Sequence, residues 1–144
     1  MRMRLLIVSA MTSLLAACSS STSSEATAVT PPPSQTTSQQ EVGRATMKIG
    51  QTVSVGDLRL TFRSVEGDSR CAIDVVCVWA GDAEIALKIE QGGKAAVAAL
   101  HTTLEPKKTD WNGYTISLVS VAPSRRAGTP VDSADYRAEI VVTR

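Results

Sequence analysis

The sequence predicts an all-β fold, a small antiparallel β-sandwich or barrel of about six or seven strands that follows a disordered N-terminal tether. Two observations lead to this fold class. Apolar and polar residues alternate with a period of two in several short segments, which is typical of half-buried antiparallel strands. Turn-forming residues separate these segments at short intervals, and no window shows a convincing helical stripe.

The alternation and the turns place the individual strands. Gly92-Gly93 suits a tight hairpin, and Asn112-Gly113 is the strongest short hairpin signal in the chain. Residues 95–100 are rich in alanine, but the glycine turn before them favours a strand over a short helix. We therefore expect strands at residues 47–55, 57–63, 83–91, 94–103, 114–121 and 136–143.

The first 17 residues have the layout of a secretory signal peptide. Arg2 and Arg4 form a short positive segment, and an apolar stretch over residues 5–17 follows it. A helix of that length reaches about 20 Å, which is too short to span a hydrocarbon core of about 30 Å. The segment is therefore expected to be a cleaved export signal and not a transmembrane helix.

The apolar stretch ends in Leu15-Ala16-Ala17-Cys18, which resembles the lipobox of bacterial lipoproteins. This resemblance implies that Cys18 is lipidated on sulfur, that the signal is cut just before it, and that the new amino group is usually acylated. Two or three acyl chains anchor a protein stably to a membrane, whereas one does so only marginally. Ser19 in place of Asp favours the outer membrane, facing the periplasm. The alternative is an ordinary signal peptide with an accidental cysteine.

A tether and one folded domain are expected to make up the exported chain. Residues 19–41 consist almost entirely of Ser, Thr, Pro and Gln, so they cannot bury enough apolar surface to fold. We assign residues 18–44 to the lipidated cysteine and the tether. Residues 45–144, about one hundred in number, form a single β domain.

Cys71 and Cys77 remain in the exported chain, and a structural disulfide is the expected state in an oxidising compartment. The competing interpretations have less support. A structural zinc site needs four ligands, and His101 is the only histidine. A thioredoxin-like pair has the spacing Cys-x-x-Cys, and a catalytic cysteine needs a histidine base for which His101 is a distant candidate.

Residues 68–83 follow the pattern D-S-R-C-x-x-x-V-x-C-x-W-A-G-x-A. This pattern resembles a group of small bacterial secreted and lipoprotein domains, although Ala72 stands where that group has proline. The resemblance implies a domain type and no mechanism. Arg70, Trp79 and Asp82 are the candidates for a binding loop. We expect Trp79 to pack against the disulfide and close one end of the core, with a rigid loop that presents Arg70 to a protease as the alternative.

No catalytic residue, metal site or cofactor is expected, and the chain is not expected to be an enzyme. The acids around the disulfide loop, Asp68, Asp74, Asp82 and Glu84, are expected to be exposed, because no EF-hand spacing is present. The alternative is a metal protein or hydrolase that uses His101 with these acids.

The charge balance indicates no nucleic-acid partner. Without Arg2 and Arg4 the chain keeps 13 basic residues of its 15, against 14 acidic ones. Arg125 and Arg126 lie in an irregular stretch, residues 122–135, that is expected to be a solvated loop. The expected partners are the membrane, through the lipid anchor, and an envelope protein that contacts the β domain. The domain is thus expected to act as a binding or structural module.

Overall fold

The structure is a computed structural model, and it describes residues 39–144. The predictions for the signal peptide, for Cys18 and for most of the tether lie outside these residues. Within them, the predicted all-β fold is confirmed: eight strands form two antiparallel sheets of four strands each. No helix in the described part of the chain has the length and apolar character to cross a membrane.

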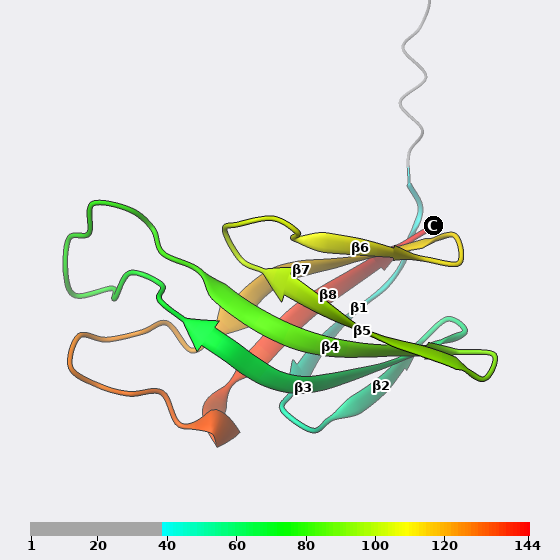
Figure 1. Cartoon of the computed structure of the whole chain (residues 1–144), viewed down its shortest axis with the longest axis horizontal. Helices are drawn as coiled ribbons and strands as arrows, with labels where there is room; N and C mark the ends of the chain where they lie inside the picture. Colours follow the sequence, from blue (N-terminus) through cyan, green and yellow to red (C-terminus); the bar gives the residue numbers. More distant parts are fainter. Residues whose placement is uncertain (1–38) are drawn as a thin grey trace, which may run out of the picture. The chain divides into compact units, whose positions relative to one another are not determined.

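The two sheets follow a simple order (Figure 1). One sheet has the order β1-β8-β7-β6, and the other has the order β2-β3-β4-β5. The strands are β1 (Glu41–Lys48), β2 (Thr52–Val55), β3 (Leu58–Asp68), β4 (Ala83–Gln91), β5 (Lys94–His101), β6 (Lys108–Trp111), β7 (Tyr114–Ala122) and β8 (Arg137–Thr143). A single 3-10 turn, Ser133–Asp135, precedes β8.

The prediction of one strand over residues 47–55 was wrong, because the chain turns in the middle of that segment. Gly50 has a φ of 82°, and the turn there separates β1 from β2, so the two strands belong to different sheets. β1 also begins at Glu41 and includes residues 41–44, which the sequence pattern assigns to the tether. Its partner is the last strand, β8, where Met47 lies opposite Ala138. Local sequence carries little trace of a pairing between the two ends of the domain.

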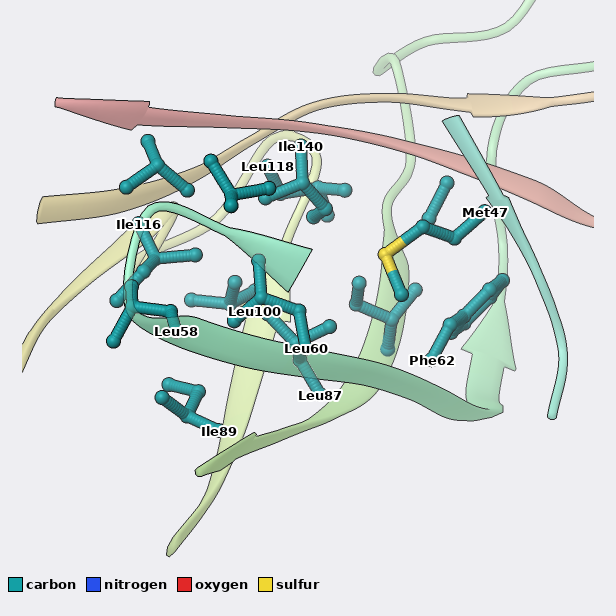
Figure 2. Packing of buried hydrophobic residues seen from close by; sticks show 14 of the residues in the cluster. Met47, Leu58, Leu60, Phe62, Leu87, Ile89, Leu100, Ile116, Leu118 and Ile140 are labelled. Carbon is teal, nitrogen blue, oxygen red and sulfur yellow. The ribbon is translucent and has the colours of Figure 1, made fainter. Parts of the chain in front are cut away.

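One hydrophobic core fills the space between the sheets (Figure 2). The alternating apolar residues of β3 and β4 point into it, as the sequence pattern predicts. Met47 and Phe62 lie at one end of the labelled cluster, and Leu118 and Ile140 come from the sheet opposite Leu60. The largest fully buried side chains are those of Phe62, Met47, Leu58, Leu60, Ile85, Leu87, Ile89, Leu100, Ile116, Ile140 and Val142.

The two ends of the sandwich differ in the length of the connections between strands. At one end lie the tight turns at residues 56–57, 92–93 and 112–113, together with Gln40 and Arg144, whose backbones are hydrogen-bonded to each other. At the other end lie the longer connections, residues 69–82, 102–107 and 123–136. We call these the turn end and the loop end. The first described residues, Gln39 and Gln40, and the C-terminal Arg144 therefore lie at the turn end, opposite the long loops (Figure 1).

Candidate functional site

The segment of residues 69–82 at the loop end starts as an extension of the β3–β4 hairpin. The backbone N–H of Ser69 donates to the Asp82 carbonyl at 2.7 Å, and the N–H of Cys71 donates to the Ala80 carbonyl at 2.7 Å. Gly81 is required between these bonds: its φ is 69°, and an added Cβ would lie 1.9 Å from the Ser69 carbonyl oxygen. The segment is thus held close at its base.

The predicted disulfide between Cys71 and Cys77 is confirmed. Their Cα atoms lie 6.0 Å apart, and the bond closes the tip of the segment into a ring. Ala72, directly after the first cysteine, is buried and fixes the ring against the domain. Residues 73–80 in contrast are all exposed. The structure therefore holds a rigid base and an exposed tip.

Asp68 and Arg70 form a bidentate ion pair beneath the disulfide ring. Nε of Arg70 donates to Oδ1 of Asp68 at 2.8 Å, and Nη2 donates to Oδ2 at 2.7 Å. The two side chains are only 15% and 7% exposed, Arg70 and Asp68 respectively. The hydroxyl of Tyr136 donates a further bond to Asp68 at 3.0 Å. Burial alone raises the pKa of Asp68, but the bonds from Arg70 and Tyr136 outweigh it and lower the pKa below its ordinary value.

Arg70 is held inside the loop end, which disfavours the alternative in which the loop presents Arg70 to a protease. Its guanidinium also donates to the carbonyls of Val121 and Pro123, and its own carbonyl accepts a bond from Arg125 at 2.9 Å. Every nitrogen of the guanidinium is therefore used inside the domain. A protease would have to break these bonds to reach the side chain.

The loop of residues 123–136 supports the disulfide ring from one side. The N–H of Ile73 donates to the Arg125 carbonyl at 3.0 Å, and the N–H of Ala127 donates to Oδ1 of Asp74 at 2.9 Å. Arg125 is thus a structural contact within the loop end, and Arg126 beside it is exposed, as expected for a solvated loop.

Asp82 and His101 form the second polar contact of the loop end. Oδ2 of Asp82 lies 2.7 Å from Nδ1 of His101, and Oδ1 accepts bonds from the N–H groups of Thr103 and Leu104. Burial by itself raises the pKa of Asp82, but the bonds from His101, Thr103, Leu104 and the Thr102 hydroxyl outweigh it and lower the pKa to about 2. The carboxylate thereby fixes the start of the loop that follows β5.

The prediction that the acids around the disulfide are exposed was right only for Asp74. Asp82 is buried, and the side chain of Asp68 is only 7% exposed, and both carboxylates are hydrogen-bonded inside the domain. Glu84, on β4, is half-buried. Within residues 39–144 no group of three or more Cys, His, Asp and Glu side chains converges in a way that would hold a metal ion. The carboxylates of Asp68 and Asp82 therefore act in the scaffold. The sequence carries no signal that pairs Asp82 with His101, which is 19 residues away.

Five exposed apolar side chains lie at the loop end, within residues 73–79. We call Ile73, Val75, Val76, Val78 and Trp79 the apolar tip. The side chains of Val76 and Val78 are fully exposed, and Trp79 is 61% exposed. The expected packing of Trp79 in the core was therefore wrong. The reason is geometric: β4 begins only at Ala83, so Trp79 lies between the disulfide ring and the start of β4, beyond the end of the sheets.

A shallow groove of about 300 Å³ lies beside the apolar tip. Trp79 and Leu104, both largely exposed, form its apolar part, and Glu84 and His101 contribute polar groups. Of the three candidate binding residues, Trp79 alone is an exposed member of this surface. Arg70 and Asp82 instead hold the loop that carries it.

Comparisons of the chain with protein-family models, with curated proteins and with solved structures found no match. The resemblance of residues 68–83 to small bacterial secreted domains therefore stays a prediction.

Proposed function

We propose that this chain is a lipid-anchored envelope protein whose β domain binds another envelope protein through the apolar tip. The observation that carries the proposal is the exposure of Ile73, Val75, Val76, Val78 and Trp79 on one disulfide-closed segment. Single exposed apolar residues are normal on a protein surface, but five of them within seven residues of chain are not, and such a grouping marks an interaction site more often than a random surface does. Tryptophan is among the residues that contribute most to binding at protein interfaces.

The scaffold beneath the tip supports a binding role. The disulfide, the Arg70–Asp68 ion pair and the contacts to residues 123–136 hold the segment in one conformation. A rigid loop loses little conformational entropy when it binds, so more of its contact energy contributes to affinity. None of these contacts uses the side chains of Val76 or Val78, which stay available to a partner.

The position of the tip favours a protein over a bilayer as the partner. Gln40, where the described chain enters the domain, lies at the turn end, and the apolar tip lies at the opposite end of the strands. The single charged side chain among residues 71–80 is the acid Asp74, and no basic side chain is present there to attract anionic lipid. We infer a partner with an apolar cleft in the same compartment.

A site-specific photo-cross-linker at Val78, in intact cells, tests the proposed partner. We expect one dominant adduct whose added mass is that of a protein other than this chain. The same group at Val119, an exposed apolar position on β7, is the matched control and should give no such adduct. Val76→Asp should abolish the Val78 adduct with the domain still folded. Equal adducts at both positions, or no adduct at Val78, would overturn the proposal.

Vesicle flotation separates the protein partner from a membrane. Purified residues 19–144, which lack both the apolar signal segment and the anchoring thiol, should stay with the soluble fraction when mixed with vesicles of phosphatidylethanolamine and phosphatidylglycerol. Flotation that depends on Trp79 and Val78 would assign the tip to lipid insertion and contradict the proposed protein partner.

The lipid anchor has its own test. Mass spectrometry of the N-terminal peptide should show Cys18 as the first residue, with a mass increase of a diacylglyceryl group and an acyl group. Cys18→Ala should remain uncut and unlipidated. A free N-terminus at another residue would show that an ordinary signal peptide is cleaved there, and it would contradict the proposed lipid anchor.

A further inference from the structure

We infer a second interaction surface: the open edge of β5, which pairs with β5 of a second copy of this chain to form a symmetric dimer. This surface is separate from the apolar tip, and it rests on backbone geometry. β5 (Lys94–His101) is an edge strand of its sheet, with β4 on its other side.

The backbone groups on this open edge can be identified from the hydrogen-bond pattern. The N–H of Thr102 donates to the Ala83 carbonyl on β4, whereas the N–H of His101 points away from β4 to the Pro106 carbonyl. Because N–H and C=O groups alternate in direction along an antiparallel strand, those of Ala95, Val97 and Ala99 also point away from β4. No backbone hydrogen bond within residues 39–144 uses these three residues on that side.

The other three edges have the protection that natural edge strands normally show. β2 and β6 have only four residues each. β1 has charged side chains at Glu41, Arg44 and Lys48 and a register shift near its start. Short length, charge and bulges all hinder pairing with another chain. These edges are therefore poor templates for a further strand.

Apart from the charge of Lys94 at its start, β5 has none of these protective features. It is eight residues long, it pairs with β4 without a register shift, and it contains no proline. Between Lys94 and His101 all its residues are Ala, Val or Leu. The small side chains leave the backbone open to an approaching strand. An edge of this kind is the template used in strand-addition complexes.

The sequence of β5 is complementary to itself. In an antiparallel pair centred on Val97, Val97 faces Val97 of the second copy, and Ala95 faces Ala99 of the second copy. These facing residues are the ones whose N–H and C=O groups point outward, so each of these pairs can exchange both hydrogen bonds, and the pairs between them, such as Ala96 with Ala98, are the non-hydrogen-bonded pairs of the ladder. The side chain of Val97 is 55% exposed, and the two copies would bury it against each other.

The charges are compatible with a second copy. Lys94 lies opposite Leu100 of the second copy, and the two Lys94 side chains are at opposite ends of the pair, about 20 Å apart. No like charges oppose each other across the interface. A pair of this kind repeats one patch on both partners, which is the arrangement of most homodimers. It would join two four-stranded sheets into one continuous sheet.

Disulfide trapping in intact cells, with the full-length protein, tests this pairing. In the proposed register the two Val97 Cα atoms lie about 5.5 Å apart, within the range that a disulfide spans. Val97→Cys should give a covalent dimer on a non-reducing gel. Val119→Cys, at a valine of β7 that is 48% exposed against 55% for Val97, is the control for random cross-linking and should remain monomeric.

The register has a sharper test. Ala95→Cys and Ala99→Cys should each give little dimer alone, because each residue lies about 13 Å from its own copy across the pair. Co-expression of the two variants with different tags should give a heterodimer in high yield. Equal dimer from Val97→Cys and Val119→Cys, or no heterodimer on co-expression, would overturn the proposed pairing.

Charge repulsion gives an independent readout. Val97→Lys places two like charges at the centre of the pair, so the purified protein in detergent should fall from dimer to monomer by analytical ultracentrifugation. Val119→Lys should leave the dimer intact, and both variants should keep the β-sheet circular dichroism spectrum of the wild type. A wild-type protein that is monomeric at all concentrations would overturn the inference. The Val78 photo-cross-link should persist in Val97→Lys, so that failure of one proposal is distinguishable from failure of the other.

Discussion

Oδ2 of Asp82 lies 2.7 Å from Nδ1 of His101, and this contact joins the base of the disulfide segment to the end of β5. The same carboxylate binds the backbone of the loop that leads to β6. One buried acid therefore organises two of the three long connections at the loop end. The stability of that end should depend on the charge of Asp82.

The first prediction concerns the loss of stability at low pH. Since folding lowers the pKa of Asp82 from 3.8 to about 2, the ionised form stabilises the folded state. This contribution is fully present above about pH 4 and is lost as the pH falls toward 2. Its size is about 2 kcal/mol in the free energy of unfolding. Urea unfolding at pH 5 and at pH 2.5 should show the loss.

Asp82→Asn provides the control for this prediction. The variant should be less stable than wild type at pH 5, and the difference between the two should shrink at pH 2.5. Other acids with lowered pKa values, among them Asp68, contribute equally to the acid dependence of both proteins and cancel in the comparison. A constant difference at the two pH values would contradict the role assigned to Asp82.

The second prediction concerns the ion pair beneath the disulfide ring. Arg70→Ala leaves the carboxylate of Asp68 buried with no cation beside it, so we expect a loss of about 3 kcal/mol in the free energy of unfolding. Arg126→Ala, at an exposed position of the neighbouring loop, should change it by less than about 0.5 kcal/mol. A double-mutant cycle with Asp68→Asn should return a clear coupling energy. Additive effects would show that the two residues act separately.

The third prediction concerns the disulfide. Replacement of Cys71 and Cys77 by serine should cost about 2 kcal/mol, because the bond closes a short loop. The core lies outside this loop, so the variant should keep its β-sheet circular dichroism spectrum. Hydrogen exchange should speed up mainly in residues 71–80. Unfolding of the whole domain at neutral pH would contradict this division between ring and core.

The fourth prediction compares two glycines with positive φ. Gly81→Ala brings a Cβ to within 1.9 Å of the Ser69 carbonyl oxygen, whereas at Gly92 nothing lies within 4 Å of an added Cβ. Gly92→Ala should therefore cost only the backbone strain, about 1 kcal/mol. Gly81→Ala carries the same strain and a backbone clash, so it should cost at least twice as much. Thermal or urea unfolding of the two variants side by side measures the difference.

Local sequence was sufficient for most of the strands. Alternation of apolar and polar residues placed β3, β4, β7 and β8, and the turns at Gly92-Gly93 and Asn112-Gly113 placed the hairpins. These signals work because side chains on a strand alternate between the two faces and because turns need particular backbone angles. The disulfide followed from the number of cysteines and the expected compartment.

Long-range contacts decided the parts of the structure that local sequence did not predict. The turn at Gly50 and the pairing of β1 with β8 join residues almost one hundred positions apart, and no local pattern encodes such a pair. Trp79 was expected to pack against the disulfide at one end of the core, because the domain has few aromatic residues for a core. β4 begins only at Ala83, however, so Trp79 lies beyond the sheets and is exposed. The roles of Arg70 and Asp82 depend on partners from other loops. The sequence by itself determined most of the strands, although it missed β6 and the turn between β1 and β2, because alternation and turn residues are local signals. Only the tertiary structure decided which side chains hold the loop end together and which ones stay exposed, because these depend on contacts between distant segments.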